Sequence, residues 1–459
     1  MNSFQTIFDQ QKEYFNSDAT KSYEWRIQQL DQLAALLKDN EQVLLNAIGK
    51  DFKSSLAESA FEIAAPLGTI EFTKAFLKEW MDPQEATLPA FLRDSGHKGI
   101  VYREPYGVTL VIGPFNGPLI LLLHPAIAAL SAGNTVVLKP SNALTETTAL
   151  LSKLIPSYFE PEAVTIVTGG REEITELLKI PFDFIFFTGS TKVGKIVLKA
   201  AAENLTPVVL ELGGQNPAIV DDTADIADAA RKLVWGATAW GGQWCTSPGF
   251  AYVHESIAEE FVKEAKKALS DMYGPNPETH PDFSRIISAN EVKRLASLLP
   301  KEGVIAGGSY IEEQRYFAPT LVYPVTWKDQ IMEDEIFGPI LPILTYSDFK
   351  DAIRQIKKIP KPLAGYIFSS HEDNINYFLN SLSFGGGAVN EVNVQLYIET
   401  MPFGGVGKSG MGHYYGKFGY DNLTHAKSIL IAPSGKAIEH LIPPYTMEKI
   451  QELNKWLEY

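Results

Sequence analysis

The feature that most constrains the fold is a regular alternation, between residues 107 and 204, of short apolar segments with segments of helical spacing. The apolar segments cover residues 107–113, 134–141, 163–170 and 182–190, and the helical ones cover 118–133, 145–155, 171–180 and 193–204. Strands that are apolar throughout are covered on both faces, and strands joined through helices run parallel. A second cycle follows residues 210–220, with helices at 224–240 and 256–270 and strands near residues 304, 320 and 340. The sequence therefore predicts an α/β protein with parallel sheets.

The rest of the chain predicts more than one domain, because 459 residues exceed what a single hydrophobic core supports. Residues 1 to about 82 have helical spacing, and residues 83–104 form an extended pattern with Pro, Gly and Arg that predicts a hairpin outside the main layers. Residues 108–130 lack Asp, Glu, Lys and Arg, as a membrane helix would. Prolines 114, 118 and 125 interrupt this segment, so we interpret it as buried core.

Cysteine content and charge limit the compartment and the partners. Cys245 is the only cysteine, which excludes a disulfide framework and a cysteine-rich zinc cluster and predicts a reducing, cytoplasmic location. The N-terminal residues show no basic segment followed by an apolar core, so no secretory signal is expected. The net charge of −15 argues against nucleic acid or an anionic membrane as the main partner.

Two local features suggest chemistry but each has a plain alternative. Gly189, Ser190 and Gly194 lie between a strand and a helix, where backbone N–H groups and the helix dipole can hold a phosphate. Their spacing matches neither G-x-G-x-x-G nor a P-loop, so a simple turn explains them equally well. Cys245, in the segment GGQWC, is by itself either an inert core residue or a nucleophile.

Seven segments in a fixed order resolve this ambiguity. They are GPFNGP, TVVLKPS, FTGSTKVG, LELGGQNP, GGQWC, EIFGPILP and MPFGGVGKSGMG. Together they resemble the signature segments of the NAD(P)-dependent aldehyde dehydrogenase superfamily, from about residue 20 to 432. The short N-terminus and the ending GKSGMGHYYGKFGYDNLTHAKSIL look most like the class 3 branch, which includes coniferyl-aldehyde and fatty-aldehyde enzymes.

The resemblance implies an architecture. A Rossmann-type dinucleotide-binding domain would comprise residues 1–82 and 105–210, and an α/β catalytic domain residues 211–420. Residues 83–104 and 421–435 would form a small bridging β segment for oligomerisation, and residues 436–459 a C-terminal tail. The family pattern further implies a homodimer, NAD or NADP as cofactor, an aldehyde as the small-molecule substrate, and no metal.

The resemblance also assigns the catalytic residues. Cys245 matches the nucleophile, whose thiolate adds to the aldehyde to give a thiohemiacetal and, after loss of hydride, a thioester. A thiol titrates near pH 8.5, so dipoles or the nicotinamide cation must favour the thiolate. Asn116 matches the donor to the oxyanion, together with the backbone N–H of Cys245. Glu211 matches the base that activates the deacylating water, and Glu335 resembles the residue that holds the nicotinamide ribose and could share the base role.

The remaining matches concern the cofactor. The residues expected to contact it are Ile112, Gly113, Pro114, Phe115, Lys139, Ser141, Asn142, Gly189, Ser190, Val193, Gly194, Leu212, Gly213, Glu335 and Phe337. Lys139 should reach the adenosine ribose, and Phe337 should pack beside the nicotinamide.

The chain departs from the family pattern at two places. Many relatives have a glutamate after KPS, where this chain has Asn142; without a carboxylate to repel the 2′-phosphate, we expect NADP to be accepted. Trp240 and Trp244 flank the nucleophile segment, and either narrow the aldehyde funnel towards aromatic or slim aliphatic substrates or belong to the core.

Three other functions fit the sequence less well. A CoA-acylating relative would need no water-activating base, and Glu211 argues against it. A cysteine hydrolase would need a histidine base, and His124, His254, His413 and His425 lie in no recognisable dyad motif. A protein that kept the fold but lost turnover is disfavoured by the presence of Cys245, Asn116 and Glu211, although a fold alone proves no activity.

Overall fold

The structure is a computed structural model that describes residues 3–453. Its N-terminal helices are α1 (Ser3–Asn16), α2 (Tyr23–Asp39), α3 (Glu41–Asp51) and α4 (Leu56–Met81), which confirms the helical prediction for this region. The Ser22 hydroxyl caps α2 by accepting from the backbone N–H of Trp25, and Ser55 caps α4 in the same way. Leucines and isoleucines on α2 and α4 pack with those of α6 (Ile120–Ala132) in one core.

The first sheet follows the predicted alternation. Its strands are β3 (Val108–Ile112), β4 (Thr135–Lys139), β5 (Val164–Ile166), β6 (Phe184–Thr188), β7 (Val208–Glu211) and β17 (Gly410–Met411), in the order β17-β7-β6-β3-β4-β5. All pairs except β17–β7 are parallel. Helices α6, α7 (Thr145–Tyr158), α8 (Arg171–Leu177) and α9 (Thr191–Glu203) connect the strands. Every residue of β3 and α6 is buried, so the uncharged segment 108–130 is core, as predicted.

Among residues 3–453, no helix combines the length and the apolar character that crossing a bilayer requires.

The second sheet has seven strands in the order β10-β13-β14-β9-β8-β15-β16. They are β8 (Asn216–Val220), β9 (Pro248–His254), β10 (Val304–Ala306), β13 (Thr320–Val322), β14 (Ile340–Tyr346), β15 (Ala364–Phe368) and β16 (Gly386–Val389); only β10 is antiparallel. Its helices are α10 (Ile226–Thr238), α11 (Ala258–Tyr273), α12 (Ala289–Leu298), α13 (Phe349–Ile356) and α14 (Glu372–Ser381), with a small hairpin of β11 (Tyr310–Ile311) and β12 (Tyr316–Phe317). The strands expected near 304, 320 and 340 are confirmed.

The predicted helix 224–240 is shorter than expected. It ends at Thr238, because Trp240, Gly241 and Gly242 all have positive φ angles (56°, 62° and 69°) that an α-helix does not accept. This turn directly precedes the segment that contains Cys245.

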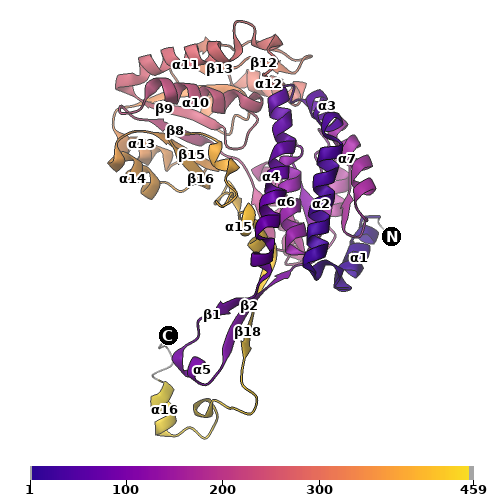
Figure 1. Ribbon diagram of the computed structural model, residues 1–459. Coiled ribbons are helices and arrows are strands. Elements are labelled where there is room, and N and C mark those ends of the chain that lie inside the picture. Colours follow the sequence, from indigo (N-terminus) through magenta and orange to yellow (C-terminus); the bar gives the residue numbers. More distant parts are fainter. Residues whose placement is uncertain (1–2, 454–459) are drawn as a thin grey trace.

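A third sheet forms an arm that projects away from the two larger sheets (Figure 1). Strand β2 (Lys98–Pro105) pairs with β1 (Gln84–Ala86) and with β18 (Thr424–Ile431), both antiparallel. Helix α5 (Ala90–Asp94) joins β1 to β2, so residues 83–104 form the expected hairpin, and α16 (Met447–Leu453) follows beyond β18. Ile429, Leu430 and Ile431 are exposed on the arm.

One predicted boundary differs from the structure. Residues 211–420 were expected to form a single catalytic domain, yet β17 pairs with β7 of the first sheet, and α15 (Gly416–Asn422) packs against α4 and α6. The chain therefore returns to the first sheet before residue 420, and the bridging strand begins at Thr424 rather than at 421. Gly410 allows this return, because its φ of 152° and missing side chain let β17 approach the Leu210 carbonyl.

Candidate active site

The carboxyl edge of the first sheet collects the predicted cofactor residues. The connections that follow β3 and β6, two neighbouring strands, lead away in opposite directions along the sheet, and such a switch point opens a crevice for a ligand. The residues at this edge are Ile112, Gly113, Pro114 and Phe115 after β3, Lys139, Ser141 and Asn142 at the end of β4, Gly189, Ser190, Val193 and Gly194 after β6, and Leu212 and Gly213 after β7. The topology thus brings together segments that are 100 residues apart.

The local geometry of this edge fits a dinucleotide. Ser190 caps α9 by accepting from Val193 N–H at 3.4 Å, and the start of that helix faces the edge with Val193 37% exposed. Lys139 is buried at the end of β4, where its Nζ donates to the Pro140 carbonyl at 2.7 Å and burial lowers its pKa. The absence of a side chain at Gly213 leaves room for the carboxylate of Glu335, which a Cβ there would displace. The residues present can therefore hold NAD or NADP along this edge.

A carboxylate that sequence reasoning missed lies beside Lys139 and Asn142. Glu173, in the first turn of α8, accepts from the backbone N–H of Gly170 at 2.7 Å, and this bond, with one to its own N–H, lowers its pKa. Its carboxylate and the Asn142 amide both approach Gly170. The G-G-x-x-E spacing at residues 169–173, a capping box, was the available signal.

The nucleophile segment is held by buried amides. The Gln243 side chain donates to the carbonyls of Trp240 (3.0 Å) and Arg285 (2.9 Å), and accepts from Ile287 N–H at 2.9 Å. This side chain is 1% exposed, so the turn before Cys245 is fixed without help from water.

A second buried amide holds the segment from the other side. Asn216 Nδ2 donates to the carbonyls of Cys245 and Ser247, both at 2.9 Å, while its Oδ1 accepts from Ala364 N–H at 2.8 Å. The Tyr366 hydroxyl donates to the Thr246 carbonyl at 2.8 Å. Asn216 lies inside the segment LELGGQNP, but its role as a support of the nucleophile was not predicted.

Two carboxyl groups act on the thiol of Cys245. Glu211, the last residue of β7, is 1% exposed, and neither of its carboxyl oxygens has a hydrogen-bond partner among residues 3–453. Burial raises the pKa of Glu211 well above its ordinary value and raises that of Glu335 to about 7. Burial also raises the pKa of Cys245, and the charges of Glu211 and Glu335 raise it further. The backbone N–H groups of Cys245 and Thr246 lower this pKa, but by less. The backbone N–H groups thus favour the thiolate, as one of the two expected causes required, but burial and the two carboxyl groups outweigh them in the protein alone.

Asn116 and the nucleophile segment are tied together by the start of α4. Asn116 is 3% exposed in the loop before α6. Glu62 Oε2 accepts from the backbone N–H groups of Leu119 and Ile120 at 3.0 Å each, at the start of that helix. The buried Nζ of Lys53 pairs with Glu62.

Lys53 also contacts the segment that contains the nucleophile. Lys53 Nζ lies over the ring of Trp240, whose backbone N–H donates to Glu58 at 2.7 Å. Glu58 also accepts from Ser284 at 2.6 Å. Sequence reasoning missed these residues; the four-residue spacing of Glu58 and Glu62, which puts two carboxylates on one helix face, was the only signal.

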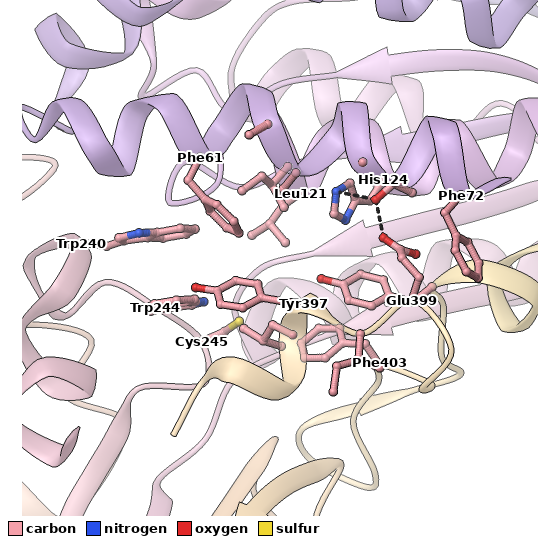
Figure 2. Close-up of a pocket in the computed structure, with 18 residues that line it drawn as sticks. Phe61, Phe72, Leu121, His124, Trp240, Trp244, Cys245, Tyr397, Glu399 and Phe403 are labelled. Atoms are coloured by element: carbon pink, nitrogen blue, oxygen red, sulfur yellow. Dashed lines mark hydrogen bonds between the residues drawn. The ribbon is translucent and has the colours of Figure 1, made fainter. Parts of the chain in front are cut away.

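An apolar pocket of about 570 Å³ leads to Cys245 (Figure 2). Phe61, Phe72, Leu121 and Phe403 line it, together with Trp240 and Trp244. The two tryptophan rings stack at 4.4 Å between centroids, and each is 5% exposed. The rings are packed as core and also form part of the pocket wall, while their influence on the choice of aldehyde stays a prediction.

A histidine also lines this pocket, but it makes no dyad with the thiol. His124 hydrogen-bonds through Nε2 to Thr69 Oγ1 at 3.2 Å, and burial lowers its pKa to about 4. A base this weak at neutral pH, turned towards Thr69, gives no support to a cysteine hydrolase.

Phe337 and Phe115 complete the junction between the crevice and the nucleophile segment. Their rings meet edge to face at 5.8 Å, and Phe115 contacts Phe52 in the same manner. Phe337 has a φ of 50°, which turns the chain between Glu335 and β14.

The chain was compared with known proteins. The family model described as the aldehyde dehydrogenase family matches residues 2–429. The 4,4'-diaponeurosporen-aldehyde dehydrogenase of Staphylococcus aureus is 40% identical over 97% of both chains. The aldehyde dehydrogenase family 3 member B1 of Rattus norvegicus is 38% identical over 99% of this chain and 97% of the relative. The solved structure of Staphylococcus aureus AldH in a substrate-bound state has a TM-score of 0.97 and 39% identity, with all of both chains covered.

Proposed function

The chain belongs to the aldehyde dehydrogenase family, is similar to its class 3 members and oxidises an aldehyde with NAD or NADP; from this premise we propose that Cys245 is the nucleophile, Asn116 the oxyanion donor and Glu211 the base of that reaction. The observation that carries the assignment is the buried, unpartnered carboxyl group of Glu211, which acts on a thiol at the end of an apolar pocket. A buried carboxyl group without a partner costs free energy, and carboxyl groups with raised pKa values are typical of functional sites.

The steps follow from these residues. The thiolate of Cys245 adds to the aldehyde carbon, and the new oxyanion is stabilised by the Asn116 amide and the Cys245 N–H. Bound NAD or NADP supplies the acceptor for the hydride. The thioester on Cys245 is then hydrolysed: Glu211 takes a proton from water, the hydroxide adds to the carbonyl carbon, and the C–S bond breaks to release the carboxylic acid.

Glu335 is proposed to serve the cofactor side first. Its carboxylate lies against Gly213 and takes a backbone hydrogen bond from Gly214, at the edge where the nicotinamide ribose would be held. With a pKa of about 7 it can also exchange protons with solvent near neutral pH, which supports a share in the base role.

The substrate is proposed to be an apolar aldehyde. The lining of the pocket is mostly aromatic and aliphatic, so an aliphatic or aromatic chain gains free energy by leaving water there. Trp240 and Trp244 would shape the part of the pocket next to the carbonyl.

The oligomeric state, the location in the cell and the choice between NAD and NADP are also proposals. Exposed apolar residues on the arm, with an unpaired edge of β18, support a symmetric homodimer formed through the third sheet. The single cysteine, held as a free thiol, supports a reducing cytoplasmic location. The amide of Asn142 supports acceptance of NADP as well as NAD.

The test is a rapid-mixing experiment with a panel of aliphatic and aromatic aldehydes, in which reduced nicotinamide is followed. Wild-type protein should turn over, Cys245→Ser should produce no reduced cofactor, and Glu211→Gln should give a burst of about one equivalent per subunit and then stall as thioester. A Glu211→Gln variant that turns over at the wild-type rate would remove Glu211 from the mechanism. Release of the stalled acyl group by coenzyme A and not by water in the wild type would favour the acylating alternative.

A further inference from the structure

The apolar pocket contains one hydrogen-bonded cluster away from the thiol, formed by Thr69, His124 and Glu399. Figure 2 shows His124 and Glu399 on the side of the pocket opposite Trp240 and Trp244, and Thr69 hydrogen-bonds to both. Glu399 is the only carboxylate that lines the pocket within the part of the chain that the structure describes. Glu399 is only partly buried, yet it lies in an aromatic and aliphatic wall, where a carboxylate is costly to desolvate.

The direction of each hydrogen bond in the cluster can be assigned. The Thr69 hydroxyl donates to Glu399 Oε1, so its oxygen is the acceptor for His124 Nε2 at 3.2 Å. Because the only hydroxyl proton of Thr69 goes to Glu399, Nε2 of His124 must be the donor in this contact, so we assign the ring proton to Nε2. The second ring nitrogen, Nδ1, is buried and has no partner in residues 3–453, and the side chain is 5% exposed. Glu399 Oε2 accepts from Gly416 N–H at 3.2 Å.

This assignment leaves the cluster with acceptors only. The donors of Thr69 and His124 are both used inside it, while the carboxylate of Glu399 keeps free lone pairs and is only partly buried. A substrate end that only accepts hydrogen bonds, or that has no polar atom, would displace water from Glu399 without replacing its hydrogen bond. A site of this kind discriminates against such analogues strongly.

We propose that Thr69, His124 and Glu399 form a specificity subsite that accepts a hydrogen bond from a hydroxyl group at the distal end of the aldehyde. The inference rests on the proposed function, since it concerns the far end of the same pocket. A hydroxyl fits better than an ammonium group, because one carboxylate in an apolar wall cannot satisfy three N–H donors that have lost their water. Burial raises the pKa of Glu399, and a donated hydrogen bond would offset part of that penalty.

The experiment compares three series of straight-chain aldehydes of increasing length that end in a hydroxyl, a methoxy or a methyl group. The methoxy end is polar but only accepts, so it is the matched control for the hydroxyl. For wild-type protein, kcat/KM should be roughly tenfold to a hundredfold higher for the hydroxyl than for the methoxy series at one optimal length. Equal values at every length would overturn the subsite.

Two variants locate the effect. In Glu399→Gln one acceptor oxygen becomes an NH₂ donor, and the remaining oxygen can still accept from Thr69 or from Gly416 N–H. The subsite then has fewer lone pairs for a substrate hydroxyl, so the preference should fall to about one or reverse in favour of the methoxy end. Thr69→Val should also lower the hydroxyl preference. Thr73→Val, one turn further along α4 and outside the apolar pocket, is the structural control and should keep it. A hydroxyl preference that survives Glu399→Gln would refute the assignment.

The outcome is separable from that of the proposed function. If the methyl-ended aldehydes are oxidised and Cys245→Ser abolishes this, the dehydrogenase assignment stands whatever the distal preference. If oxidation persists in Cys245→Ser, the proposed nucleophile fails and the distal preference is judged from wild type alone.

Discussion

Replacing Asn216 by leucine tests whether one buried amide holds the nucleophile segment in place. The change removes two hydrogen bonds to the carbonyls of Cys245 and Ser247 and one from Ala364 N–H, at 2.8–2.9 Å. Asn216 is 1% exposed, so water cannot take over these bonds. Each buried backbone group left unpaired costs about 1–3 kcal/mol, and the three together cost roughly 3–9 kcal/mol of local stability.

Two variants distinguish the bond that Asn216 accepts from Ala364 from the two bonds that it donates to carbonyl groups. In Asn216→Leu the Ala364 amide loses its acceptor, and a local loss of about 3 kcal/mol makes its hydrogen exchange more than roughly a hundredfold faster. Asn216→Asp is the matched variant: it can still accept from Ala364, but loses both donors and turns a carboxylate towards the carbonyls of Cys245 and Ser247. Its Ala364 amide should therefore stay protected.

Both variants should lose activity for the same reason. The two donor bonds set the backbone path through Cys245, and a displacement of the nucleophile by about 1 Å costs on the order of a hundredfold in kcat. Hydrogen exchange measured by mass spectrometry on peptides that cover β15, with kcat from the same preparations, would decide the matter. Wild-type exchange at Ala364 in Asn216→Leu, or wild-type kcat in both variants, would refute the reasoning.

Three further predictions concern charge in the site. Alkylation of Cys245 by iodoacetamide should be slow at about pH 7.5, roughly 1 pH unit below an ordinary thiol pKa, because burial and two carboxyl groups raise the pKa of this thiol. The rate should increase once the oxidised cofactor is bound, because its cation favours the thiolate. Equal rates would show that formation of the thiolate does not depend on the cofactor. Activity should rise with pH through about 7 as Glu335 ionises, and Glu335→Gln should remove that limb of the kcat/KM profile. Asn142→Glu should raise the KM for NADP relative to NAD and Glu173→Gln should lower it, whereas unchanged ratios would exclude both residues from cofactor choice.

The sequence predicted those parts of the site that lie at strand ends. Asn116 and Glu211 follow or end strands of one parallel sheet, and the carboxyl ends of such strands lie at one edge. The apolar runs therefore predicted the sheet, whereas Asn116 and Glu211 were singled out by the family resemblance, and the sheet places both at its carboxyl edge. The pairing of β17 with β7 was outside this reasoning, because a strand of two residues, Gly410 and Met411, is too short to show an alternating or apolar pattern.

Residues on α4 were missed for a different reason. Helical spacing tells which face of a helix is buried, but it does not tell which distant loop meets that face. Glu62 reaches the start of α6, and Thr69 reaches Glu399, 330 residues further along the chain. Only the folded arrangement shows that one face of α4 supports both Asn116 and the distal end of the pocket.

The protonation of the site explains why two carboxyl groups stand near one thiol. Burial and the charges of Glu211 and Glu335 keep the proton on Cys245 in the protein alone, so the lone thiol is protected until substrate chemistry begins. Forming the thiolate then needs a cation nearby and an exit for the proton. Glu211 is 1% exposed and burial raises its pKa well above the ordinary carboxyl value, which makes its ionised form a stronger base, whereas Glu335 is partly exposed with a pKa of about 7. A group with this pKa takes up and releases protons with equal ease near neutral pH, so Glu335 is the better exit to solvent and Glu211 the better base for a water held inside the closed site.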